Sequence, residues 1–156
     1  MAEKKIASII KSFDELTPHQ LYDCLRLRSA IFVVEQNCVF LDMDNKDQEC
    51  YHLMLYQDNV LVAYSRLVPP GLYYSEAAIG RVITSSTVRG KGMGRTLMER
   101  SIKSVYDLFG KQDIRIGAQI YAQKFYESLG FVPDGSIYDE DGIDHVEMIK
   151  PAAPAN

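Results

Sequence analysis

The sequence predicts an α+β (α/β layered) domain, in which helices flank a mixed, mainly antiparallel sheet. Three observations support this fold class. Two β-like runs meet at Asp58-Asn59, a pair typical of a tight hairpin turn. A third β-like run, 77–84, leads through a glycine-rich segment into an amphipathic helix. Short strand and helix patterns then alternate towards the end of the chain, which favours layers of helix against sheet.

The N-terminal part is expected to contain a strand and then a well-capped helix. Isoleucines within residues 5–13 indicate a short first strand. Thr17 is a suitable N-cap, Pro18 suits the first helical position, and Gln20 completes a capping box. Apolar residues recur at helical spacing after this cap, so the helix is expected to run to about Val33.

The rest of the chain indicates further strands and two more helices, with six or seven strands in all. Strands are expected at 52–57, 60–68, 77–84, 113–118, 131–132 and 145–149, and helices at 93–109 and 121–129. Gly110 stands where a helix C-cap belongs, and His52 is expected to have a structural role. Residues 37–50 are irregular and acidic, and we expect the cluster from Asp42 to Asp47 to be a solvated loop without a metal ion.

Length and charge argue against several classes of protein. A chain of 156 residues is expected to form one domain, residues 1–150, followed by a flexible tail at 151–156. Its net charge of −4 is not the basic excess typical of nucleic-acid-binding proteins. No stretch approaches the roughly 20 apolar residues that span a bilayer. Three cysteines without motif spacing favour reduced thiols in a cytoplasmic protein. The sequence leaves the oligomeric state open.

The strongest chemical signal is the segment Arg89-Gly90-Lys91-Gly92-Met93-Gly94 between a strand and a helix. Glycines let a backbone turn tightly and approach a ligand closely. The free amides at the start of the following helix favour a phosphate group. The segment lacks the Gly-Lys-Ser/Thr ending of a P-loop and the glycine spacing of a dinucleotide-binding fold. A flexible charged turn is the alternative that this segment alone leaves open.

A second motif lies about thirty residues further on, Ala122-Gln-Lys-Phe-Tyr-Glu-Ser-Leu-Gly-Phe131. Together with Arg89-x-x-Gly92-x-Gly94, it resembles the pyrophosphate loop and the later helix motif of the GNAT family of N-acetyltransferases. Residues 32–36, Asp42-x-Asp44-x-x-Asp47 and 140–148 are similar to the ElaA-like branch of that family. With these segments, the resemblance spans almost the whole chain.

The resemblance implies a GNAT-type fold that binds acetyl-coenzyme A, the acetyl donor, where two neighbouring parallel strands splay apart. The strand 79–84 would face the pantetheine arm of the cofactor, and residues 89–96 would hold its pyrophosphate. Gln119 stands where many relatives carry Asn near the pantetheine, which is a departure from the family pattern. The implied cofactor-binding residues are Val82, Ile83, Thr84, Arg89, Gly90, Lys91, Gly92, Met93, Gly94, Arg95, Thr96 and Gln119.

The same resemblance implies the catalytic residues. Tyr126 matches the tyrosine that in many relatives protonates the leaving thiolate, although a packed aromatic side chain is the alternative. Glu35 or His145 could take a proton from the acceptor amine, and Arg81 would face the substrate. For these three residues, a purely structural role is an equal alternative. No metal site is expected.

These inferences predict an N-acetyltransferase that moves an acetyl group from acetyl-coenzyme A to a primary amine by direct attack in a ternary complex. The acceptor, a small molecule or a peptide, is not identified by the sequence. Two alternatives remain. One is an acyltransferase like the acyl-homoserine-lactone synthases, and the other is a module that binds acetyl-coenzyme A as a sensor without turnover.

Overall fold

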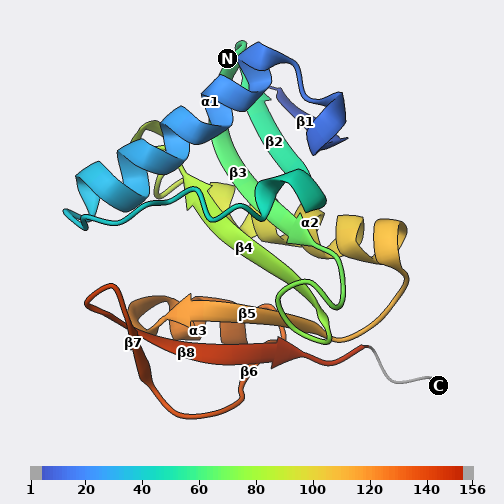
Figure 1. Ribbon diagram of the computed structural model, residues 1–156, viewed down its shortest axis with the longest axis vertical. Helices are drawn as coiled ribbons and strands as arrows, with labels where there is room; N and C mark the ends of the chain where they lie inside the picture. Colours follow the sequence, from blue (N-terminus) through green and yellow to red (C-terminus); the bar gives the residue numbers. More distant parts are fainter. Residues whose placement is uncertain (1–4, 153–156) are drawn as a thin grey trace.

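A mixed sheet of eight strands runs through the computed structural model, which describes residues 5–152 (Figure 1). The strands lie in the order β1-β2-β3-β4-β5-β8-β6, and β7 pairs with β8. Every pairing is antiparallel except the one between β4 and β5. The strands are β1 (Ile6–Ser12), β2 (Tyr51–Gln57), β3 (Val60–Val68), β4 (Ala77–Thr84), β5 (Ile114–Gln119), β6 (Val132–Pro133), β7 (Tyr138–Glu140) and β8 (Ile143–Lys150). The predicted fold class is confirmed.

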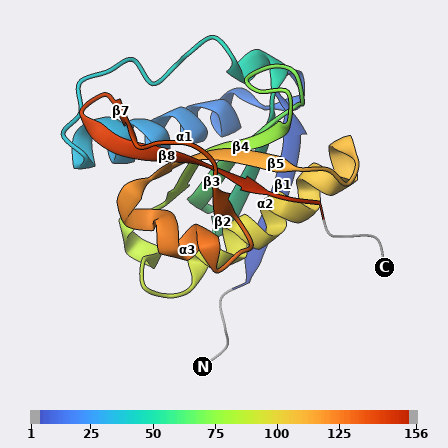
Figure 2. The same ribbon diagram turned by 90° about the horizontal axis from the view of Figure 1, so that it is seen from below.

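Helices cover both faces of this sheet (Figures 1 and 2). The helix α1 (Pro18–Arg28) lies on one face, while α2 (Met93–Phe109) and α3 (Gln123–Glu127) lie on the other. Side chains alternate along β2, so that Met54 packs with α1 and its neighbours Leu53 and Leu55 pack with α2. Within residues 5–152, no helix is both long and apolar enough to cross a membrane.

The local signals in the sequence produce the expected caps and turns. The amide of Gln20 donates to the side chain of Thr17 at 3.1 Å, and the amide of Thr17 donates back to Gln20 at 3.0 Å. Asp58 and Asn59 both have positive φ angles, 52° and 63°, as a type I′ hairpin turn requires. Gly110 is the C-cap of α2, with a φ of 89°. The tail at 151–156 falls largely outside the described residues.

Three details of the secondary structure differ from the prediction. The helix expected at 121–129 is a 3₁₀ turn, η5 (Ile120–Ala122), followed by the shorter helix α3 (Gln123–Glu127). The first helix continues past Arg28 in π-helical geometry, over η2 (Ser29–Glu35), rather than as α-helix to Val33. The short strand β7 was not predicted, because three residues give too little periodicity to indicate a strand. It raises the strand count from the expected six or seven to eight.

The parallel strands β4 and β5 separate soon after they meet. They pair only at Ala77 with Ile114 and at Ala78 with Arg115. Further along, β4 contains a β-bulge, since Arg81 and Val82 together lie opposite one residue of β3. Arg81 has a φ of 49°, an uncommon conformation for a non-glycine residue. The bulge and the short pairing leave space between the two strands.

The expectation of a solvated loop at Asp42 to Asp47 is wrong. Asp42 and Asp47 are only 6% and 7% exposed, and they pair with arginines from distant elements. Arg28 lies 2.7 Å from Asp42 and 2.9 Å from Asp47, and Arg66 lies 2.9 Å from Asp47 and 2.7 Å from Asp44. An acidic run looks solvated in a sequence because its cationic partners lie on α1 and β3, far away in the chain.

His52 is part of this buried cluster, which confirms its structural role. One ring nitrogen lies 2.6 Å from the hydroxyl of Tyr64, and the other lies 2.9 Å from the carbonyl oxygen of Asp47. Burial lowers the pKa of His52, with a hydrogen bond to Asp47 opposing that shift. The ring therefore fixes the 3₁₀ turn at Asp47–Glu49 against the sheet.

We expect Asp47→Ala to destabilise the protein by about 3–5 kcal/mol at pH 7, because it leaves two buried guanidinium groups without their shared acceptor. Urea unfolding monitored by circular dichroism measures this change. Burial opposes the charge of Asp47, but hydrogen bonds from Arg28 and Arg66 outweigh it and lower its pKa from 3.8. The stabilisation is therefore complete above about pH 4, and the difference between wild type and variant shrinks as the pH falls below that value. Glu49→Ala, on the exposed side of the same turn, should change stability by less than about 0.5 kcal/mol.

Candidate functional site

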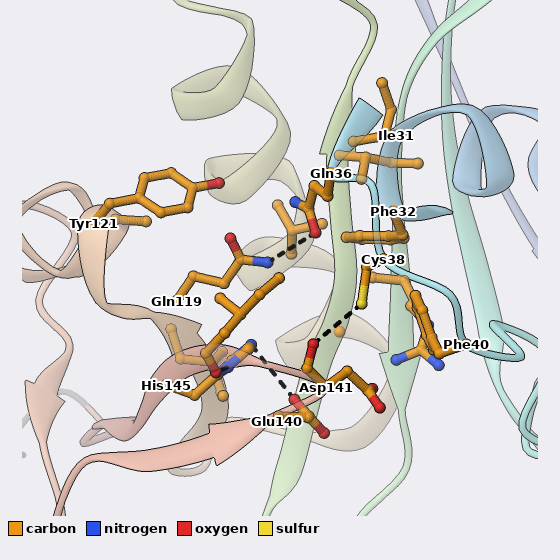
Figure 3. Close-up of a pocket in the computed structure, with 18 of the residues that line it drawn as sticks. Ile31, Phe32, Gln36, Cys38, Phe40, Gln119, Tyr121, Glu140, Asp141 and His145 are labelled. Carbon is orange, nitrogen blue, oxygen red and sulfur yellow. Dashed lines mark hydrogen bonds and ion pairs between the residues drawn. The ribbon is translucent and has the colours of Figure 1, made fainter. Parts of the chain in front are cut away.

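The space between β4 and β5 is a cavity of about 650 Å³, within the usual size range of ligand pockets (Figure 3). The two strands form its floor, η2 and the following loop form one wall, and the β7–β8 hairpin forms the other. The lining residues are Ile31, Phe32, Glu35, Gln36, Cys38, Phe40, Leu41, Asp44, Tyr73, 79–84, Arg89, Ile116, Gly117, Gln119, Tyr121, Ala122, Tyr126, Glu140, Asp141, Ile143 and His145.

The glycine-rich loop forms the start of α2. Gly90 and Gly92 have φ angles of 76° and 78°, which favour glycine, and Gly92 is the N-cap. No side chain caps this helix, so its first amides are available to a ligand. Two of the predicted basic groups are already in contact with the protein, since Lys91 donates to Thr87 and Arg95 donates to Ser128 at 2.6 Å.

The predicted cofactor residues fall into two groups. Five of them line the cavity, namely Val82, Ile83, Thr84, Arg89 and Gln119. The other seven, Gly90, Lys91, Gly92, Met93, Gly94, Arg95 and Thr96, form the loop and the first turn of α2 outside the lining. Gln119 donates to Gln36 across the cavity at 3.4 Å, a long contact that a ligand could replace (Figure 3).

Glu35 is paired with Arg89 in a two-pronged contact. Both guanidinium nitrogens donate to the carboxylate, each at 2.6 Å, and one of them also donates to the carbonyl oxygen of Thr84 at 3.2 Å. The hydrogen bonds from Arg89 lower the pKa of Glu35. This contact joins the end of η2 to the glycine-rich loop and makes Glu35 a poor proton acceptor.

His145 lies on β8, 7% exposed, with its ring at the cavity wall (Figure 3). Its Nδ1 is 2.8 Å from the carbonyl oxygen of Ile143, which can only accept, so we assign the proton to Nδ1. In the neutral form of the ring the lone pair is then on Nε2, which lies 3.4 Å from a carboxylate oxygen of Glu140. The ring also stacks on Tyr138, with centroids 5.7 Å apart.

Arg81 lines the cavity, but its charge is paired with the acidic loop. Its Nη2 donates to the carbonyl oxygen of Asp42 at 2.8 Å, and the same nitrogen lies 3.5 Å from the carboxylate of Asp44. Its Nε lies 2.8 Å from a carboxylate oxygen of Asp42, a close ion pair whose angles fall outside hydrogen-bond geometry. These contacts hold the bulge of β4 against the loop.

Tyr126 joins the cavity to the main core. It lines the cavity, while its ring packs edge-on against Phe125 at 5.2 Å and Phe131 at 6.0 Å. Burial raises the pKa of Tyr126, and the neighbouring Tyr121 adds to that shift. The phenol is therefore protonated at neutral pH. The structure is compatible with a proton donor and with a packed aromatic at this position.

Sequence reasoning missed several lining residues. Tyr121 is 80% exposed and lies at the cavity edge (Figure 3). Phe40 lines the wall formed by the loop after η2, and Glu140 and Asp141 line the wall formed by the β7–β8 hairpin. Glu140 and Asp141 belong to a segment that the family resemblance included, although it assigned them no role. No sequence signal marked Phe40, because its loop has no regular periodicity.

Comparisons with known proteins agree with this geometry. The Acetyltransferase (GNAT) domain matches residues 32–152. Protein ElaA of Escherichia coli is 38% identical over 138 residues, which are 87% of this chain and 90% of ElaA. The crystal structure of that ElaA has a TM-score of 0.84, covering 94% of this chain and 99% of the other.

Two further solved structures share this fold. An acyl-CoA N-acyltransferase from Pseudomonas aeruginosa has a TM-score of 0.90 at 36% identity, covering 94% of this chain and 99% of its own. A CoA-dependent acyl-homoserine lactone synthase, BjaI, has a TM-score of 0.77 over 96% of this chain and 84% of its own. At 18% identity, that likeness shows a shared fold alone. The chain belongs to the GNAT acetyltransferase family, in its ElaA-like branch.

Proposed function

We propose that this protein is a cytoplasmic N-acetyltransferase whose one domain, residues 1–150, moves an acetyl group from acetyl-coenzyme A to a primary amine. One observation carries the proposal. The strands β4 and β5 pair over only two residues and then separate around a cavity, which lies beside the N-terminus of α2, where no side chain caps the helix. Such a cavity suits a long thin thioester arm, and a free helix N-terminus suits its phosphates. Membership of the GNAT family supports the same reading.

The residues present fit this cofactor. Within residues 5–152, β4 pairs with β5 only at Ala77 and Ala78, so the peptide groups between Val82 and Thr84 that face the cavity can pair with the amides of a pantetheine arm. The positive φ angles of Gly90 and Gly92 bring backbone amides to the surface without side chains in the way. Bound there, acetyl-coenzyme A supplies the activated thioester carbonyl.

The reaction needs no covalent enzyme intermediate, because an amine held beside a thioester in a ternary complex can attack it directly. We assign His145 as the group that takes a proton from the acceptor ammonium, since Nε2 carries the lone pair at the cavity wall. Glu140 beside it stabilises the protonated ring. Tyr126 donates a proton to the departing thiolate.

We expect His145→Gln to lower kcat/KM at pH 7 by about 10²–10⁴-fold, with partial recovery at high pH, where more of the amine is already neutral. Glu35→Gln should instead raise KM for acetyl-coenzyme A several-fold and leave the shape of the pH–rate profile unchanged, because Glu35 orients Arg89. Steady-state thiol release from pH 6 to 10 measures both. If the acidic limb of the pH–rate profile is lost in Glu35→Gln but kept in His145→Gln, the base is Glu35 instead.

The experiment that tests the proposed function is a thiol-release assay with acetyl-coenzyme A and a panel of primary amines, with product identified by mass spectrometry. A transferase gives amine-dependent release and an N-acetylated product. Tight binding without turnover of any amine would indicate a sensor module instead. Turnover only with longer acyl donors and an amino-lactone precursor would favour the acyl-homoserine-lactone type, whose fold is shared.

A further inference from the structure

The charges around the cavity are unequally neutralised. The two arginines of the lining are both paired with carboxylates, Arg89 with Glu35 and Arg81 with Asp42. Asp44, which also lines the cavity, is paired with Arg66. These groups therefore present no uncompensated charge to a ligand.

The β7–β8 hairpin adds two carboxylates to the lining, and neither has an arginine or lysine partner among the described residues. Side chains alternate along the hairpin, so Glu140, Ile143 and His145 line the cavity, whereas Asp144 does not. Asp141, in the turn, also lines it. Among residues 5–152, only His145 lies within ion-pair distance of Glu140, and no basic side chain lies that close to Asp141.

Apolar side chains complete the wall that faces this hairpin. Phe32 and Phe40 line the cavity from η2 and the loop after it (Figure 3), and Leu41 of the same loop also lines it. The sulfur of Cys38 lies 3.2 Å from the carbonyl oxygen of Asp141, so this loop and the hairpin tip are in direct contact. An aliphatic chain can therefore lie against one wall while the carboxylates of the other wall attract a cation.

We propose that the acceptor is an amine with a second positively charged group and no carboxylate, of which a linear aliphatic diamine is the simplest example. This inference rests on the proposed function, because it assumes that the acceptor enters at the hairpin. Glu140 and Asp141, which have no arginine or lysine partner among the described residues, attract the second cation. A carboxylate on the acceptor would be repelled by Glu140 and Asp141 and would find no unpaired arginine in the lining.

Three amines with a five-carbon chain test this inference, since they differ only at the far end: pentane-1,5-diamine, pentylamine and 5-aminopentanoate. We expect kcat/KM to fall in that order, by at least about tenfold between the diamine and the amino acid, at low ionic strength. The preference should shrink at 0.5 M salt, because the carboxylates are exposed to solvent and are screened.

A matched pair of variants locates the effect. Asp141→Asn removes one lining charge, and asparagine tolerates the φ of 53° at this turn. It should reduce the preference for the diamine over pentylamine about three- to tenfold. Asp144→Asn removes the same charge from the same hairpin on the side away from the cavity, and should keep the preference.

Calorimetry separates this inference from the proposed function. Titrating each amine into the protein with coenzyme A present measures acceptor binding without chemistry. Diamine binding that depends on Asp141, without acetyl transfer to any amine of the wider panel, would support the preference of this cavity for a second cation and refute the transferase. Equal or better use of 5-aminopentanoate, or an unchanged preference in Asp141→Asn, would overturn the inference and leave the transferase intact. Absence of both binding and turnover with all three amines would overturn the inference, and the wider panel of primary amines would then decide the proposed function.

Discussion

A Tyr126→Phe variant should turn over about 10²- to 10⁴-fold more slowly while its affinity for coenzyme A hardly changes. The substitution removes only the hydroxyl, and the ring keeps its edge-on contacts with Phe125 and Phe131. Burial raises the pKa of Tyr126, so the phenol is protonated at neutral pH and has a proton to donate. Single-turnover measurements with a working acceptor amine give the rate of the chemical step, and calorimetry gives the affinity.

The structural alternative predicts a different pattern across two variants. If Tyr126 only packs, Tyr126→Phe remains nearly as active as wild type. Tyr126→Ala then fails through lost stability, by about 3–5 kcal/mol as for other large aromatic residues. A loss of tenfold or less in Tyr126→Phe, with chemistry shown to be rate-limiting, would remove Tyr126 from the catalytic residues. Thermal unfolding of both variants shows which effect is at work.

The sequence predicted the fold well wherever a local signal determines the structure. The capping box at Thr17, the hairpin turn at Asp58-Asn59 and the C-cap at Gly110 depend on neighbouring residues alone. Each fixes an element boundary, and the strand pattern between the boundaries follows from apolar periodicity. Most expected strands and helices therefore appear close to their predicted positions.

What could not be predicted depends on contacts between distant segments. Asp42 looks solvated in the sequence, because Arg28 and Arg81 approach it only after folding. Glu35 and Arg89 are 54 positions apart in the sequence, so their pairing could not be predicted. Because of this pairing, we assign Glu35 to the orientation of Arg89 rather than to proton transfer. The family resemblance located the cofactor loop and Tyr126. It gave no information on which charged side chains of the cavity lining lack a partner. Those charges decide which acceptor amine the cavity favours.

The glycine-rich loop permits a sharp test of the phosphate site, for which Gly94 is the best position. An added Cβ at Gly94 would meet only the ring of Phe125, at an ordinary contact distance of 3.7 Å. Gly92 is less suitable, because its φ of 78° would strain any side chain. A glutamate in the first turn of α2 interacts favourably with the helix dipole, so Gly94→Glu should fold at least as stably as wild type.

We expect Gly94→Glu to weaken binding of coenzyme A by about 10²-fold, which corresponds to roughly 2.7 kcal/mol. The new carboxylate occupies the positive end of the helix and repels the phosphates that would bind the same amides. Gly94→Gln has nearly the same volume without the charge, so it should weaken binding by about tenfold or less and separates charge from bulk. Calorimetric titration of both variants, each shown to be folded by thermal unfolding, measures the difference. Unchanged affinity in a folded Gly94→Glu variant would show that the phosphates bind elsewhere. Equal losses in both variants would indicate that side-chain volume, rather than negative charge, excludes the ligand from the first turn of α2.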